Sequence, residues 1–224
     1  MLILAFSVSW VALAKVDFLY PLWHDHTGIA SGIERFAPQN RYKQGFAETS
    51  AEQRYQLFAE INRSVHQHGE GLTEISYETA TSHGKQALLR DAEVVHLEDV
   101  AKLIDRLTWL VLINVVVLSL MVWLFIKRSL PLPSIKQCLL GNAFVFTALA
   151  LALIFIGPTQ LFYLFHIWVF PKEHQWFFYY QDSLMSTMML APVLFGWIAA
   201  AWVFLSCLLL PCFILLLRLL TKKA

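Results

Sequence analysis

The sequence predicts a mainly α-helical membrane protein with four transmembrane helices. Of its 224 residues, 58% are hydrophobic and only 15% are charged, whereas soluble domains carry about 25% charged residues. Four apolar stretches reach or approach the roughly 20 residues that a helix needs to cross a bilayer. A polar region separates the first two stretches, and an aromatic segment separates the last two. We therefore expect a small α+β extracytoplasmic domain between helices 1 and 2, and an aromatic interfacial segment between helices 3 and 4.

The first apolar stretch, Met1–Ala14, is short for a transmembrane helix. It reaches the required length if the helix continues through Val16–Trp23, with the Lys15 ammonium extending to the interface. The small-x-small pattern that ends at Ala14 also fits a signal-peptide cleavage site, so both interpretations stay open. We favour an anchor over residues 1–23, because a signal peptide begins with positive charge and the first nine residues have none.

Residues 24–105 form the predicted extracytoplasmic domain. Ser50–His68 has apolar residues near helical spacing, which predicts an amphipathic helix with Ser50 as its N-cap. Leu72–Thr79 and Lys85–Leu89 predict the two strands of a hairpin. Asp91 offers the N-cap of another helix, and the pattern after it runs unbroken into the second transmembrane segment.

Residues 106–224 hold the other three predicted transmembrane helices, Trp109–Ile126, Leu139–Ile156 and Ala191–Leu217. The aromatic segment Thr159–Asp182 lies within an outer loop over residues 159–190. Trp and Tyr gather where lipid headgroups meet hydrocarbon, because their rings are apolar and their polar atoms need water. This segment is therefore expected to lie at a membrane surface.

Charge predicts the orientation in the membrane. Basic residues concentrate on the cytoplasmic side, and two clusters without acidic residues are Lys127, Arg128 and Lys136, and Arg218, Lys222 and Lys223. Between Lys15 and Arg106, acidic residues outnumber basic ones 14 to 10. The polar region and the aromatic segment are thus both predicted to be extracytoplasmic. No concentrated basic face indicates a nucleic-acid partner.

Two histidines lie in these outward segments beside predicted transmembrane helices. His96 and Asp99 are three residues apart on the helix predicted after Asp91, so they share a face. A carboxylate beside an imidazole orients the ring and stabilises its protonated form, which suits a general base or acid. His166 has Phe162 and Phe170 at i−4 and i+4. An ordinary surface role for His96 and a core role for His166 are the alternatives.

Other classes of site have weaker support. The pairs His24/His26 and His66/His68, with His83 nearby, are a modest zinc pattern, but no H-E-x-x-H or helical H-x-x-x-H occurs, so we expect no metal. The three cysteines all fall in or beside apolar segments, which argues against a thiol oxidoreductase. A transporter is disfavoured because the last three predicted helices hold few polar residues.

Two blocks give the chain its resemblance to a known family. The first is E-x-x-H-x-x-D-V at Glu93–Val100, and the second is F-H-x-x-x-F-P at Phe165–Pro171 followed by Trp176 and Phe177. Together with Pro192 and Phe195 before the last predicted helix, this order resembles the lipoprotein intramolecular transacylase (Lit) family of bacterial membrane proteins. The short first span and the extra histidines depart from that pattern.

The resemblance implies an acyltransferase of the bacterial cytoplasmic membrane, multi-pass and with its active site on the outer face. Its substrate would be a diacylglyceryl-modified lipoprotein among membrane lipids. The sn-2 acyl chain would move to the α-amino group of the N-terminal cysteine, without a cofactor or a covalent acyl-enzyme. His96, oriented by Asp99, would be the proton acceptor and His166 the donor, or the reverse. The expected substrate-binding residues are Phe162, Phe165, Phe170 and Trp176. A non-catalytic adaptor with a partner-binding outer domain is the alternative.

Overall fold

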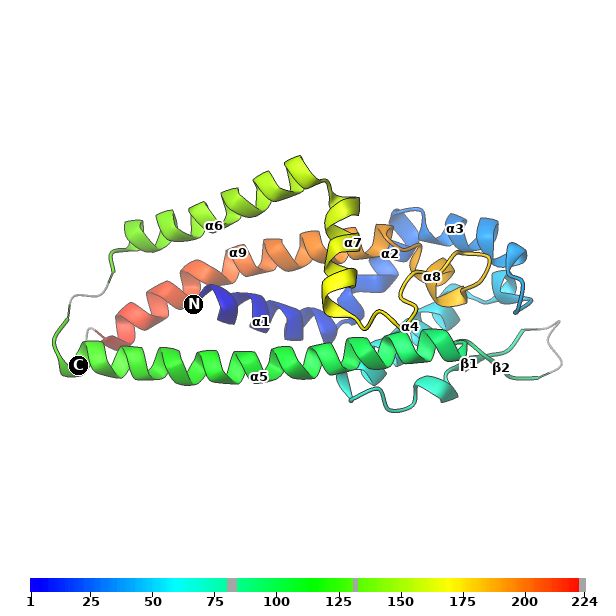
Figure 1. Ribbon diagram of the computed structural model, residues 1–224, viewed down its shortest axis with the longest axis horizontal. Helices are drawn as coiled ribbons and strands as arrows, with labels where there is room; N and C mark the ends of the chain where they lie inside the picture. The colour runs from blue at the N-terminus through cyan, green and yellow to red at the C-terminus, as the bar shows by residue number, and fades with distance from the viewer. Residues whose placement is uncertain (80–83, 131–132, 222–224) are drawn as a thin grey trace. The chain divides into compact units, whose positions relative to one another are not determined.

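The computed structural model describes residues 1–79, 84–130 and 133–221 and is mainly helical (Figure 1). The turn predicted around Ala80–Gly84 and the side chain of His83 fall largely outside these ranges. In chain order, with η denoting a 3-10 helix, the elements are α1 (Leu2–Ala14), η1 (Asp17–Leu19), α2 (Tyr20–His26), α3 (Ile29–Phe36), η2 (Ala37–Gln39), η3 (Phe46–Glu48), α4 (Ala51–His66), η4 (Leu72–Glu74), β1 (Ser76–Tyr77), β2 (Gln86–Ala87), α5 (Asp91–Lys127), α6 (Ile135–Ile156), α7 (Pro158–Val169), α8 (Leu184–Met189) and α9 (Val193–Thr221).

The chain forms two compact units, which we call the apolar unit and the polar unit. The apolar unit comprises Met1–Trp10, Thr108–Pro171 and Val203–Ala224, and the polar unit comprises Val11–Leu107 and Lys172–Trp202. Each unit is thus assembled from segments that are far apart in the sequence. Helices α1, α5 and α9 contribute residues to both.

Three helices, α5, α6 and α9, are long and apolar enough to cross a membrane. Helices α5 and α6 contain the second and third predicted spans, and α9 begins two residues after the predicted start of the fourth, Ala191. Helix α5 runs from Asp91 to Lys127 without a break, as the sequence predicts. Large apolar side chains along these helices are exposed, Phe155 for instance at 81%. Such exposure is expected where lipid rather than water surrounds a helix. The helices are compatible with a multi-pass membrane protein.

The predicted first span is bent after Ala14. Helix α1 ends at Ala14, and α2 is bent away from it by 81°, so a fourth span exists only if the bent pair forms one broken span. The three residues Asp17–Leu19 have φ between 49° and 60°, a left-handed conformation that stops an L-residue helix. The Asn62 side-chain amide donates to the Ala14 carbonyl at 2.7 Å and to the Asp17 carboxylate at 2.8 Å. These bonds satisfy polar groups that the end of α1 leaves open.

Helix α4 forms much of the core of the polar unit. It begins at Ala51, and the Ser50 hydroxyl accepts a hydrogen bond from the Gln53 amide at 3.1 Å, which confirms the predicted helix and cap. The Tyr20 ring stacks on Phe58 at 4.2 Å, and its hydroxyl donates to the Met188 carbonyl at 2.8 Å. Tyr20 therefore ties α2 to both α4 and α8. The sequence pattern did not predict α2 and α3.

The predicted hairpin is present with shorter strands than expected. Strands β1 and β2 are antiparallel and have two residues each, with Ser76 opposite Ala87 and Tyr77 opposite Gln86. The beginning of the predicted first strand is the 3-10 helix η4 instead. The buried Tyr77 ring packs on Phe46 at 5.2 Å and fixes the hairpin to the preceding loop.

The aromatic segment begins as a helix and continues as an irregular chain. Gly157, at φ 85°, separates α6 from α7, and Figure 1 shows α7 turning sharply away from α6. Helix α7 ends at Val169, two residues before Pro171. Residues 170–182 have no regular helix or strand. Their side chains are therefore placed by individual contacts.

Candidate active site

A buried carboxylate fixes the beginning of α5 in the polar unit. Glu93 is fully buried, and one of its oxygens accepts from the Arg90 amide at 2.8 Å. The other accepts from the Ser183 hydroxyl, whose oxygen in turn accepts from the Ser186 amide at 2.8 Å. Ser183 is the N-cap of α8. Glu93 thus joins the first turns of α5 and α8 through buried hydrogen bonds, and burial raises the pKa of this carboxyl.

The Asp99 carboxylate binds two partners, and neither is His96. One oxygen accepts from His174 Nδ1 at 2.5 Å, and the other lies 3.2 Å from Lys102 Nζ. Asp99 is 7% exposed, and His174 comes from the irregular chain after α7. The predicted orientation of His96 by Asp99 is therefore replaced by an orientation of His174. Sequence reasoning missed His174, because it lies 75 residues from Asp99.

His96 lies in the second turn of α5 and is half-buried in the polar unit. Its ring centroid is 6.0 Å from that of Phe178, a buried residue of the irregular chain. Because Glu93, His96 and Asp99 are spaced by three residues, they follow one another along a face of the helix. The predicted shared face is therefore lined by this irregular chain.

His166 is held in the apolar unit by its own helix. Its Nδ1 donates to the Phe162 carbonyl one turn earlier at 2.8 Å, so the proton on a neutral ring stays on Nδ1. The side chain is 8% exposed, and burial lowers the pKa of His166 because it disfavours the charged ring. A neutral imidazole in this tautomer presents Nε2 as a proton acceptor.

Three of the four predicted substrate-binding residues surround this imidazole. The ring centroids of Phe162, Phe165 and Phe170 lie 4.0, 5.4 and 5.3 Å from that of His166. Trp176 belongs to the polar unit, where its ring lies 6.0 Å from that of Phe177. Phe162 and Phe170 lie at i−4 and i+4 from His166, and Phe165 directly precedes it, so all three lie on or beside α7.

Three further histidines, His24, His66 and His68, have polar partners of their own. His24 Nδ1 lies 2.7 Å from Asp25, His66 Nδ1 lies 2.8 Å from the Asn62 carbonyl, and His68 Nδ1 lies 2.9 Å from Asp105. Tyr55 donates to Asp25 at 2.6 Å, and this bond raises the pKa of Tyr55 to about 12. Within residues 1–79, 84–130 and 133–221, no three His, Cys, Asp or Glu side chains gather as metal ligands would.

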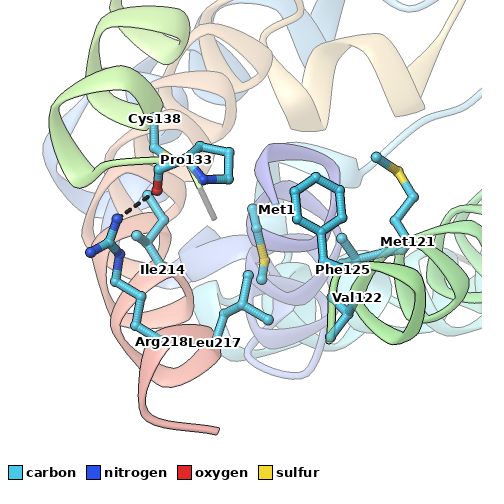
Figure 2. A pocket seen from close by; sticks show the side chains of 10 residues that line it. Met1, Met121, Val122, Phe125, Pro133, Cys138, Ile214, Leu217 and Arg218 are labelled. Carbon is cyan, nitrogen blue, oxygen red and sulfur yellow. Dashed lines mark hydrogen bonds between the residues drawn. The ribbon is translucent and has the colours of Figure 1, made fainter. Parts of the chain in front are cut away.

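The apolar unit has a cleft of about 180 Å³ (Figure 2). Ten residues from the later turns of α5 and α9 and from neighbouring segments line it, and Arg218 carries the one charged side chain among them. Figure 2 shows the Arg218 guanidinium donating to the Pro133 carbonyl at 2.5 Å. None of the predicted site residues lines this cleft.

A comparison with protein families identifies one match. The model described as lipoprotein intramolecular transacylase Lit matches residues 42–195, which is more than half of the chain. The matched range includes both Glu93–Val100 and Phe165–Pro171. No curated protein and no solved structure matches the chain significantly.

Proposed function

Because the chain belongs to the lipoprotein intramolecular transacylase family, we propose that it transfers an acyl chain within a diacylglyceryl-modified lipoprotein. The α-amine of the N-terminal cysteine attacks the carbonyl carbon of the sn-2 ester. A C–N bond forms, the C–O bond to glycerol breaks, and the amine proton ends on the glycerol oxygen. The product is a lyso-form lipoprotein with an amide-linked chain. The observation that carries this proposal is the family match over both histidine blocks.

The reaction makes modest demands on the protein. Donor and acceptor belong to one molecule, so orienting them can supply much of the rate, and no covalent acyl-enzyme or cofactor is needed. A proton must leave the attacking nitrogen and another must reach the leaving oxygen, a task for positioned acid–base groups. Negative charge on the ester oxygen must also be stabilised.

We assign the two proton-handling roles to His166 and His96. The hydrogen bond from His166 Nδ1 to the Phe162 carbonyl, together with burial, supports a neutral ring whose Nε2 accepts the amine proton. His96 is then the donor to the leaving oxygen. This is the exchanged form of the assignment that the sequence first favours. It is preferred because Asp99 hydrogen-bonds to His174 instead of His96.

Aromatic side chains are the proposed contacts for the lipid substrate. Phe162, Phe165 and Phe170 offer the transferred acyl chain an apolar wall around His166, and Trp176 is the fourth proposed contact. Burying methylene groups of the chain against such rings stabilises the bound lipid by about 0.8 kcal/mol each. We place the protein in the bacterial cytoplasmic membrane, with this site at its outer face.

Mass spectrometry of lipoproteins tests the function. The protein is expressed in bacterial cells that make only diacylglyceryl lipoproteins, and N-terminal lipopeptides are analysed. N-acylated lyso-form peptides are expected with the wild type and absent with His96→Ala or His166→Ala present at equal levels. Unchanged diacylglyceryl peptides with the wild type would refute the enzyme proposal and favour a non-catalytic adaptor.

A further inference from the structure

His174 and Asp99 form a second candidate acid–base group in the polar unit. The Asp99 carboxylate is buried at 7% exposure, whereas His174 is exposed at 37%. A buried carboxylate with a half-open imidazole is typical of a ring that exchanges protons while its orientation is kept. The carboxylate oxygen accepts from Nδ1 at 2.5 Å, so Nε2 is the nitrogen that can take a proton from outside.

Charged groups of both signs lie near His174. Asp99 faces it from α5 and also contacts Lys102 at 3.2 Å, while Lys172 and Glu173 precede it in its own segment. His96 lies one turn before Asp99 on α5. A carboxylate stabilises an imidazolium by charge and hydrogen bonding, and a buried carboxylate does so with less screening by water.

The proposed reaction contains a proton that His96 and His166 do not handle. The α-amine of a peptide has a pKa of about 8 and is therefore mostly ammonium at neutral pH. An ammonium nitrogen has no lone pair, so it cannot attack an ester. One proton must leave before attack, and a second leaves the nitrogen during acyl transfer.

Resting on the function proposed above, we propose that His174, held by Asp99, accepts the first of these protons from the substrate ammonium. The ammonium N–H bond breaks, Nε2 of His174 gains the proton, and the amine keeps its electron pair for attack. After transfer, imidazolium His174 returns the proton to water. During acyl transfer His166 accepts the second proton from the nitrogen, and His96 gives a proton to the glycerol oxygen. Each ring then returns to its starting state by exchanging one proton with water.

This assignment predicts a particular pH dependence. Without His174, the enzyme can use only substrate that is already neutral in solution. The neutral fraction falls about tenfold for each pH unit below a pKa of roughly 8. With His174, the productive complex also forms from the ammonium, so the rate falls less steeply.

Rates of lyso-form production are measured between pH 6 and pH 9 in proteoliposomes containing diacylglyceryl lipopeptide. His174→Gln can still hydrogen-bond to Asp99 but cannot take a proton. Its rate should match that of the wild type near pH 9. Below pH 8 its rate should fall about tenfold for each pH unit, which is a steeper fall than the wild type shows. Asp99→Asn should give an intermediate slope. His68→Gln is the matched control. It removes another histidine that contacts an aspartate of α5, since His68 Nδ1 lies 2.9 Å from Asp105.

The possible outcomes distinguish the proposed role of His174 from the proposed transacylase function. Parallel pH profiles for His174→Gln and the wild type would overturn the role of His174 while leaving the transacylase intact. A role in packing alone predicts that result, because glutamine preserves the contact. No product from the wild type at any pH would overturn both proposals. His96→Ala and His166→Ala should stay inactive even at pH 9, since neutralising the substrate does not replace them.

Discussion

His166 and His174 are the same side chain in two opposite settings. His166 donates to a backbone carbonyl among three phenylalanine rings, and burial lowers its pKa. His174 donates to a buried carboxylate and is open to its surroundings. The first setting favours a neutral ring, whereas the second pairs the ring with a carboxylate. The hydrogen-bond acceptor, a carbonyl for His166 and a carboxylate for His174, therefore distinguishes two histidines that lie close together in the sequence.

The largest effect is expected at His166. His166→Ala removes the proposed proton acceptor and should lower the transacylation rate by about 10²–10⁴-fold. His166→Phe keeps a ring of similar size and should be equally inactive, which separates chemistry from packing. Thermal unfolding in detergent checks that both variants are folded. Near wild-type rates in folded His166→Phe would show that His166 is not the proton acceptor.

Substitution of Glu93 should disrupt the buried hydrogen bonds that join α5 and α8 in the polar unit. Glu93→Ala leaves the Ser183 hydroxyl and the Arg90 amide without their buried acceptor, and each such loss costs about 1–3 kcal/mol. We expect a clearly lower unfolding temperature and, because α8 is loosened, lower activity. Ser183→Ala should have a smaller effect, since it removes one partner and leaves Arg90. Equal stability of Glu93→Ala and wild type would mean that this anchor is dispensable.

The burial of His166 also predicts how stability depends on pH. Its pKa is lower in the folded than in the unfolded protein, so the unfolded state binds more protons near and below pH 6.5. Stability should therefore fall as pH decreases from 7 to 5, by up to about 1.4 kcal/mol per unit. His166→Phe should show a shallower loss in thermal unfolding scans. An unchanged slope would show that His166 is not the group responsible.

The smallest effect is expected from chelation. His24, His66 and His68 are already hydrogen-bonded to oxygen atoms in the polar unit. After dialysis against a strong chelator, activity should stay within about a factor of two of its starting value. A factor of two corresponds to roughly 0.5 kcal/mol, the size of effect expected when no important contact is lost. Loss of activity that zinc restores would show that histidines serve as ligands after all.

The sequence predicted those parts of the fold that depend on local pattern. Apolar runs identified the helices α5, α6 and α9, and Ser50 with its apolar spacing identified α4. The bend after Ala14 was missed, because left-handed conformations at Asp17–Leu19 carry no glycine signal. That bend depends on Asn62, which lies 48 residues from the carbonyl it satisfies.

The candidate site divides in the same way. The phenylalanines around His166 could be predicted from helical spacing, because they lie within one turn or beside its end. The partner of Asp99 could not, since the nearest histidine in sequence is His96 and the actual partner is His174. Tertiary packing decided between two histidines that the sequence alone could not rank. Ser183, the partner of Glu93, could not be predicted for the same reason, since it lies 90 residues away in the sequence.

Transfer of the acyl chain within one molecule is the central claim, and a crossover assay tests it most directly. Purified protein in proteoliposomes receives two diacylglyceryl lipopeptides of different peptide mass, and only one carries a deuterated sn-2 chain. The account predicts that the deuterated chain becomes amide-linked to its own peptide alone. Deuterated chains on both peptides would contradict intramolecular transfer, and the absence of any amide-linked chain would contradict the enzyme.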